Sequence, residues 1–222
     1  MTKLQTLLDH EFMGNDTFVR AITHRSVGGK NNERLEFLGD SVLGIVITSK
    51  LYEVLPKASE GYLSRLRASL VNEGTLAEIA KEMSLGDFLR LGPGELRSGG
   101  FRRNSILSDA LEAVIASVYL EKGMEAAQDF VLAIFEGRLS PEILPSEHAL
   151  KDPKSRLQEV LQSRGHDIPK YKLLHVRGEA HKQMFTASCH IESLSILTEG
   201  TERSRRKAEQ SAAEVAYQQL MK

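Results

Sequence analysis

Residues 33 to 40 read Glu33-Arg34-Leu35-Glu36-Phe37-Leu38-Gly39-Asp40, and this octapeptide is more informative than any other part of the chain. The spacing predicts a helix on which Glu33, Glu36 and Asp40 share one face. Apolar residues surround and follow them: Leu35, Phe37, Leu38, Val42, Leu43, Ile45 and Val46. We expect this helix to be buried over most of its circumference, where a carboxylate is costly without a cation or a hydrogen-bond network.

A second apolar helix, expected over residues 106–120, repeats the pattern with Asp109 and Glu112 three residues apart. Two such helices predict a hard-metal site where they cross, formed by Glu36, Asp40, Asp109 and Glu112. Mg²⁺ prefers carboxylate oxygens and keeps several waters, which leaves room for substrate phosphates. A metal ion held in this way can activate water against a phosphodiester, and the four carboxylates have room for one ion or for two.

Other interpretations of the acidic residues remain open. The four carboxylates could instead form a buried network with basic residues, namely Arg34, Arg65, Arg67 or Lys50, although unpaired buried charges are costly. Glu33 and Glu60 lie in first helical turns, where the helix dipole favours an acid by about 0.3–1 kcal/mol without any function. His24 has no second histidine or cysteine at ligand spacing, so a structural or surface role is favoured over a catalytic one.

Composition limits the class of protein. The chain has 222 residues, 41% of them hydrophobic, enough for one large and one small domain. No apolar run reaches the roughly 18–20 residues that span a bilayer, and no signal-peptide pattern is present, so we expect a cytoplasmic protein without membrane contact. The single cysteine, Cys189, excludes an internal disulfide and is expected to be a structural strand residue.

The first part of the chain, residues 1–136, is predicted to be all helix. Asn32 is expected to cap the helix that runs to about Tyr52, and Ser59 the next one. Residues 75–78 are predicted to form a capping box, and residues 106–120 and 124–135 to form separate helices. Pro141 and Pro145 mark residues 137–151 as a linker.

Residues 152–222 differ in kind and are predicted to form a small α+β domain of order α-β-β-β-α. The expected strands are residues 171–179, 184–191 and 194–199, and the closing helix starts at Ser204. Its predicted inner face holds Ala208, Ala212, Val215, Ala216 and Leu220. Residues 150–222 contain 13 Lys and Arg against 9 Asp and Glu, a net charge of +4, whereas residues 1–149 carry −5. This asymmetry favours an acidic part joined to a part that binds a polyanion.

The closing helix opens with Arg205, Arg206 and Lys207, where cations oppose the helix dipole. A bound phosphate backbone would explain them, although such a run is often only a solvated face. Double-stranded RNA fits the predicted domain, because its shallow minor groove can be met by a helix and a hairpin loop. Gln158 and His181 could serve two minor grooves, with the three cations on the phosphates between them.

Four blocks of the first domain resemble the ribonuclease III family. They are Asn32 through Ser41, Thr23-His24-Arg25-Ser26, Glu60-Gly61 with Ser64 through Ala68, and Ser105 through Ala113. The second domain resembles a double-stranded-RNA-binding domain in residues 177–181 and 204–210. In that family Gly-x-Gly often precedes the basic helix; here Gly200-Thr201-Glu202-Arg203 is read as the turn, with Glu202 in place of the second glycine.

The resemblance implies an all-α endonuclease domain followed by a small α+β RNA-binding domain. It implies a homodimer that cuts double-stranded RNA with Mg²⁺, or with Mn²⁺ as a substitute, to 5′-phosphate and 3′-hydroxyl ends with short 3′ overhangs. The implied substrates are ribosomal RNA precursors, some messenger RNAs and transfer RNA transcripts, and no protein partner can be inferred. It makes Glu36, Asp40, Asp109 and Glu112 the metal-binding and catalytic residues, with Asp40 and Glu112 indispensable and Glu33 and Glu60 supporting. The rival classes are a non-catalytic RNA binder and a helical adaptor whose acids only pair with arginines.

Overall fold

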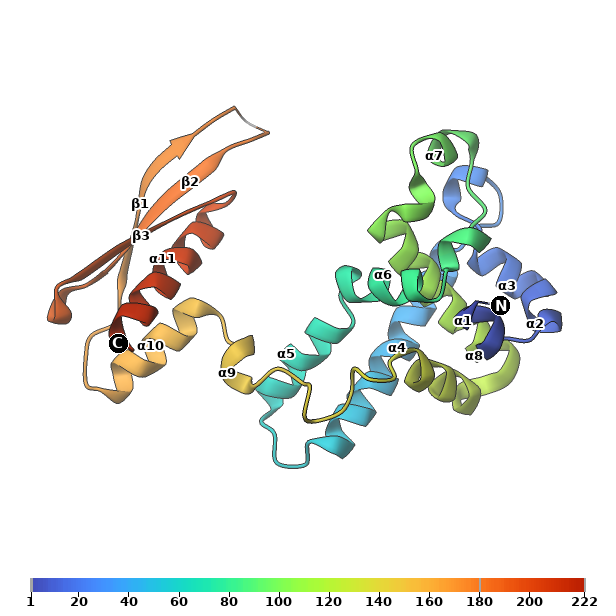
Figure 1. Ribbon diagram of the computed structural model, residues 1–222, viewed down its shortest axis with the longest axis horizontal. Coiled ribbons are helices and arrows are strands. Elements are labelled where there is room, and N and C mark those ends of the chain that lie inside the picture. The colour runs from blue at the N-terminus through green and yellow to red at the C-terminus, as the bar shows by residue number, and fades with distance from the viewer. Residues whose placement is uncertain (1, 180, 222) are drawn as a thin grey trace. The chain divides into compact units, whose positions relative to one another are not determined.

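Helices build the first of two units, Met1–Pro145, in the computed structural model, which describes residues 2–179 and 181–221 (Figure 1). Its α-helices are α1 (Lys3–Leu7), α2 (His10–Gly14), α3 (Asp16–Ala21), α4 (Glu33–Val54), α5 (Glu60–Leu70), α6 (Glu73–Glu82), α7 (Pro93–Arg97) and α8 (Asn104–Ile134). Short 3₁₀ helices are η1 (Arg25–Val27), η2 (Leu85–Phe88) and η3 (Gly100–Arg102). The predicted all-α class of this part is confirmed. None of the helices among the described residues is apolar over a length that could cross a membrane.

Helices α4 and α8 pack against each other at the centre of this unit. Their facing side chains are fully buried, as Leu43 and Ile47 are on α4 and Leu111 and Val114 on α8. At Gly39 the two backbones touch, because a Cβ atom added there would lie 1.8 Å from the carbonyl oxygen of Glu112. The glycine of the octapeptide is therefore required for the helices to meet this closely.

One face of α4 is exposed, so the expectation that this helix is buried over most of its circumference is wrong. Phe37 is 79% exposed, Ile45 57% and Tyr52 75%. At 100° per residue these three side chains fall on the same side of the helix. They form an exposed apolar stripe opposite the buried face that packs on α8.

Several predicted helix ends also differ. Asn32 is buried and makes no side-chain cap; the side chain of Asn31 accepts the N–H of Glu33 instead (3.1 Å). Helix α6 starts at Glu73 with Asn72 as its cap, so the capping box at residues 75–78 is wrong. Ser59 caps α5 as predicted. The separate helices predicted over residues 106–120 and 124–135 are confirmed, because α8 consists of two helices that meet at a kink at Gly123, whose backbone is not helical (φ 85°).

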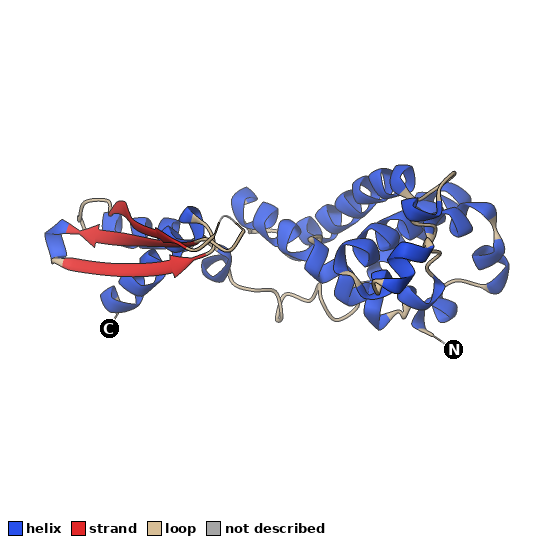
Figure 2. Ribbon diagram, turned by 90° about the horizontal axis from the view of Figure 1, so that it is seen from above, coloured by secondary structure: helices blue, strands red, loops and turns tan. Residues whose placement is uncertain are grey.

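The second unit, Ser146–Lys222, has two helices on one face of a three-stranded antiparallel sheet (Figure 2). Its elements are α9 (Glu147–Leu150), α10 (Pro153–Ser163), β1 (Lys170–Arg177), β2 (Met184–Ile191), η4 (Glu192–Leu194), β3 (Ile196–Glu202) and α11 (Arg205–Leu220). The core lies between sheet and helices and includes Leu157, Leu161, Cys189, Ile191 and Ala216. The predicted α-β-β-β-α order is confirmed, and Cys189 is a buried strand residue.

The details that differ lie around β3 and α11. The third strand runs to Glu202 rather than ending at residue 199, so Gly200 belongs to a strand and not to a turn. Gly200 is buried against α11. A Cβ atom added there would lie 2.4 Å from the backbone nitrogen of Ala212, so a side chain at this position would clash with α11. Val215, expected on the inner face of α11, is 42% exposed. Helix α9 falls within the segment predicted as a linker, where His148 hydrogen-bonds the Tyr217 hydroxyl (2.8 Å).

Substituting Gly39→Ala should destabilise the first unit by about 1–3 kcal/mol or more, since the new methyl group must push α4 away from α8. Gly94→Ala is the matched control: Gly94 is also helical, but nothing lies within 4 Å of a Cβ placed there. In an exposed helix this control is expected to gain about 0.5–1 kcal/mol. Urea unfolding of the full chain measures both, and equal stability of the two variants would contradict the close crossing.

Candidate active site

The crossing of α4 and α8 brings together two pairs of carboxylates. Glu36 and Asp40 come from α4, and Asp109 and Glu112 come from α8. We call these four residues the carboxylate cluster. Their charges act on one another, because Asp40, Glu36 and Asp109 each raise the pKa of Glu112. The structure thus gathers the four residues that the sequence selects.

Glu112 has the most altered acidity of the cluster. Burial is the main cause, followed by repulsion from Asp40, Glu36 and Asp109, and together they raise the pKa of Glu112 to about 8. Burial and then the charge of Asp109 raise the pKa of Glu36. Burial likewise raises the pKa of Asp109, against a hydrogen bond from Ser108 that lowers it. The cluster therefore resists carrying its full negative charge.

Basic side chains do not neutralise the cluster. Among residues 2–179 and 181–221, none of its four carboxylates forms an ion pair with Lys or Arg. Lys50 binds Glu53 (3.1 Å), and Arg67 donates to the Thr48 hydroxyl (3.2 Å), so neither forms the alternative network considered above. Arg25 pairs with Glu33 at 3.6 Å. Its positive charge opposes the rise in the pKa values of Glu36 and Asp109 that burial causes, but both pKa values remain raised.

The cluster fits a hard divalent cation by its chemistry, since all its donor atoms are carboxylate oxygens. In the described part of the chain, no three acidic, histidine or cysteine side chains are already arranged around one point as metal ligands. That is compatible with Mg²⁺, which keeps several waters and uses few direct carboxylate ligands. A bound cation would relieve the repulsion among these four carboxylates, which no basic side chain of the described residues neutralises.

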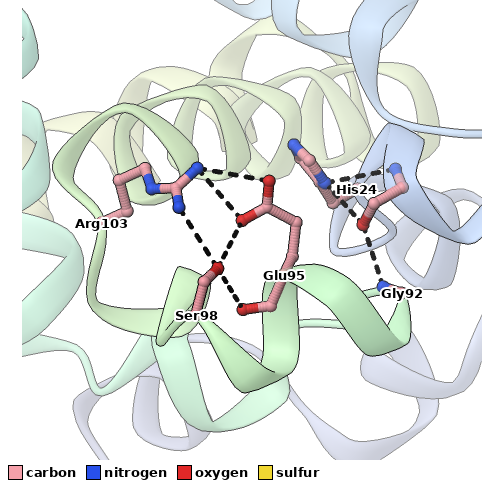
Figure 3. A network of polar contacts seen from close by, with 6 residues as sticks. His24, Gly92, Glu95, Ser98 and Arg103 are labelled. Carbon is pink, nitrogen blue, oxygen red and sulfur yellow. Dashed lines mark hydrogen bonds and ion pairs between the residues drawn. The ribbon is translucent and has the colours of Figure 1, made fainter.

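A polar pocket of about 380 Å³ opens beside the cluster. Its lining includes Glu36 and Asp109 of the cluster together with His24, Glu95 and Arg103. Figure 3 shows that Arg103 and Ser98 hold Glu95, with the guanidinium of Arg103 3.1 Å from the Glu95 carboxylate. Sequence reasoning missed Glu95 and Arg103, because each stands alone in a short turn-rich segment without a spacing pattern.

The two supporting acids lie in different surroundings. Glu33 is exposed at the same pocket and repels Glu36, which raises the pKa of Glu36. Glu60 is exposed at the start of α5, where its carboxylate accepts the Ser64 hydroxyl (2.7 Å). Among the described residues, Glu60 makes no hydrogen bond or ion pair with the carboxylate cluster.

The candidate RNA-binding residues all lie on the surface of the second unit. His181, Arg203, Ser204 and Arg205 line a hollow of about 830 Å³. Arg206 and Lys207 are exposed in the first turn of α11, whose N-terminus Ser204 caps by accepting the N–H of Lys207 (3.3 Å). Gln158 is exposed on α10, but it does not line this hollow. The structure thus brings His181 and Arg205 together.

Known proteins match both units. The family model Ribonuclease-III-like matches residues 15–137, and Double-stranded RNA binding motif matches residues 153–220. Ribonuclease 3 of Vibrio cholerae serotype O1 is 51% identical over 99% of this chain and 97% of its own length. Ribonuclease 3 of Actinobacillus pleuropneumoniae serotype 5b is 51% identical over 99% and 98%. A solved nuclease domain of ribonuclease III from Campylobacter jejuni, with structural flexibility in a region involved in dimer formation, is 46% identical, with a TM-score of 0.58 over 60% of this chain and 94% of that one.

The raised pKa of Glu112 predicts how stability depends on pH without metal. A carboxyl whose pKa rises from 4.5 to about 8 on folding contributes stability that is complete below pH 4.5 and is lost as pH rises through 8. Glu112→Gln should therefore flatten the fall of unfolding free energy over this range. Denaturant unfolding in chelator at about pH 5 and pH 8.5 measures it.

Glu60→Gln, which removes an exposed carboxylate outside the cluster, is the control for that experiment. If the unfolding free energy of Glu112→Gln fell with pH as steeply as that of the wild type, the Glu112 carboxyl would not be the cause of the fall.

Proposed function

Because this chain belongs to the ribonuclease III family, we propose that the carboxylate cluster is the site at which it cuts RNA. The chain is an endoribonuclease specific for double-stranded RNA, and its family is metal-dependent. The observation that carries the proposal is the unneutralised cluster at the α4–α8 crossing, with the pKa of Glu112 at about 8. Residues 1–136 would form the catalytic domain and residues 152–222 the RNA-binding domain, with residues 137–151 as the linker between them.

Mg²⁺ is the cofactor we propose, with Mn²⁺ as a substitute. A divalent ion bound here would supply an activated water and charge stabilisation for phosphodiester hydrolysis. Glu36, Asp40, Asp109 and Glu112 would hold it, and Asp40 and Glu112 are the two we expect to be indispensable. Glu112 must give up its proton for this role, because a carboxylate ligand has to be ionised. The products we propose carry 5′-phosphates and 3′-hydroxyls, with short 3′ overhangs.

We propose that two copies of the chain associate through the exposed stripe of α4. Apolar patches of this kind are uncommon on a monomer surface and mark interaction sites. The related nuclease domain from Campylobacter jejuni likewise has a region involved in dimer formation. In a homodimer each protomer would cut one strand, and Glu33 and Glu60 would support the site as further acids.

The second unit would bring the duplex to this site. We propose that Gln158 and His181 meet the minor groove and that Arg205, Arg206 and Lys207 meet the phosphates between. All five side chains are exposed, as such contacts require. The cellular substrates we propose are ribosomal RNA precursors, some messenger RNAs and transfer RNA transcripts, processed in the cytoplasm.

The test of this function is cleavage of a long perfect RNA duplex. Wild-type protein should shorten it with Mg²⁺ and leave it intact with chelator. Glu112→Gln, which replaces the carboxylate by a neutral amide of the same shape, should lose at least about 100-fold in rate, in the range of losses when a catalytic group is removed. It should still bind the duplex in a gel-shift assay, since the second unit is unchanged. Normal cleavage by this variant would overturn the site.

The dimer can be tested at the exposed stripe. Ile45→Asp should shift the protein from dimer to monomer in sedimentation experiments, because a charge would have to be buried in the interface. Leu197→Asp is the matched control, because Leu197 is similarly exposed (63%, against 57% for Ile45) but lies on β3 of the other unit. Dimers that persist in Ile45→Asp, or monomers in both variants, would exclude the stripe as the interface.

A further inference from the structure

His24 sits in an ordered hydrogen-bond network that the catalytic proposal does not use. Its ring nitrogen Nδ1 lies 3.2 Å from the backbone nitrogen and 2.8 Å from the hydroxyl oxygen of Ser26 (Figure 3). The hydroxyl of Ser26 in turn accepts the backbone N–H of Gly92 (2.9 Å). These bonds tie η1 to the start of α7.

The network fixes which ring nitrogen carries the proton. A backbone N–H can only donate, so Nδ1 of His24 must be the acceptor of the Ser26 N–H. The Ser26 hydroxyl already accepts from Gly92, which leaves its own hydrogen free to donate to the same Nδ1. A neutral imidazole with two donors on Nδ1 carries its proton on Nε2.

That Nε2–H has no partner among residues 2–179 and 181–221. His24 lines the pocket that Glu36 and Asp109 also line. In Figure 3 the second ring nitrogen of His24 points away from the network around Nδ1. Because His24 lines this pocket, Nε2 is the ring nitrogen that is left to donate to a ligand there.

The imidazole is held in place by the backbone as well. The N–H of His24 donates to the carbonyl of Arg90 (3.0 Å), and the N–H of Arg90 donates to that of Ile22 (2.8 Å). A Cβ on Gly92 would lie 2.2 Å from the carbonyl oxygen of Ser26, so these two loops touch. A donor fixed in this way needs little reorganisation when a ligand arrives.

We propose that the Nε2–H of His24 donates a hydrogen bond to a phosphate oxygen of the RNA strand at the cleavage site. A protonated nitrogen cannot ligate a metal ion, so Nε2 can bind a ligand only by donating its hydrogen to an acceptor, and a phosphate oxygen is such an acceptor. The pocket is otherwise rich in carboxylates, which repel a phosphate, and His24, Arg25 and Arg103 are among the hydrogen-bond donors on its wall. This role of His24 rests on the proposed function of the cluster.

The test compares two substitutions that each keep half of the imidazole. In His24→Asn, the amide oxygen lies near the position of Nδ1 and can still accept the Ser26 N–H, but the distal donor is gone. In His24→Gln, the longer amide can place an N–H near the position of Nε2. His166→Asn is the control, because Nδ1 of His166 also lies near a serine hydroxyl (3.3 Å) in the other unit.

Single-turnover cleavage with Mg²⁺ is the readout, together with melting temperature and the Mg²⁺ concentration for half-maximal rate. We expect His24→Asn to cleave about 10- to 100-fold more slowly, as for loss of one hydrogen bond to a charged group. Its melting temperature and Mg²⁺ dependence should stay unchanged, and His24→Gln should recover much of the rate. His166→Asn should match the wild type.

A wild-type cleavage rate in His24→Asn would overturn the inference. A slow His24→Asn that also needs more Mg²⁺ for half-maximal rate would overturn it too, because His24 would then act on the metal ligands and not on the RNA. If the melting temperature of His24→Asn is lower than that of the wild type, the cleavage rate of His24→Gln becomes the test. A stably folded His24→Gln that cleaves as slowly as His24→Asn also overturns the inference. Failure of the wild-type protein to cleave with Mg²⁺ would instead reject the proposed function, so the two failures are distinguishable.

Discussion

The backbone contact between Gly39 and Glu112 sets how closely α4 and α8 pack, and with it the arrangement of the acidic side chains. A side chain at Gly39 would meet the Glu112 carbonyl at 1.8 Å, so only glycine lets α4 and α8 approach this closely. The residue after Gly39 is Asp40, and Glu112 itself carries the facing carboxylate. The same contact that packs the core therefore sets the spacing of the acidic groups, and a change in the crossing would move both.

Gathering four acids in a half-buried place works against the stability of the metal-free fold. Burial and mutual repulsion raise the pKa of Glu112 to about 8, and basic residues of the described chain do not pair with the cluster. Such conflicts between local stability and arrangement are expected at functional sites. Here the conflict is resolved if a cation supplies the missing positive charge, which links metal binding to both folding and proton release.

The sequence predicted the helix order, the sheet unit and the meeting of the four acidic residues at one helix crossing, because these depend on local periodicity and on long motifs. It did not predict the exposed face of α4, since Phe37 and Ile45 look the same in a sequence whether they face a core or a partner chain. The cap at Asn72 was missed because Thr75 offered an equally good local pattern. The surroundings of His24 depend on Gly92, far away in the chain, and no spacing rule connects the two.

Locating a bound ion would show whether a cation occupies the carboxylate cluster. Crystals of the full chain soaked with Mn²⁺ would give an anomalous-scattering peak wherever that metal binds. We expect a peak between α4 and α8, with cluster carboxylate oxygens at about 2.0–2.5 Å or joined to the ion through its waters. A peak only elsewhere, with the cluster neutralised by Arg or Lys side chains, would contradict it.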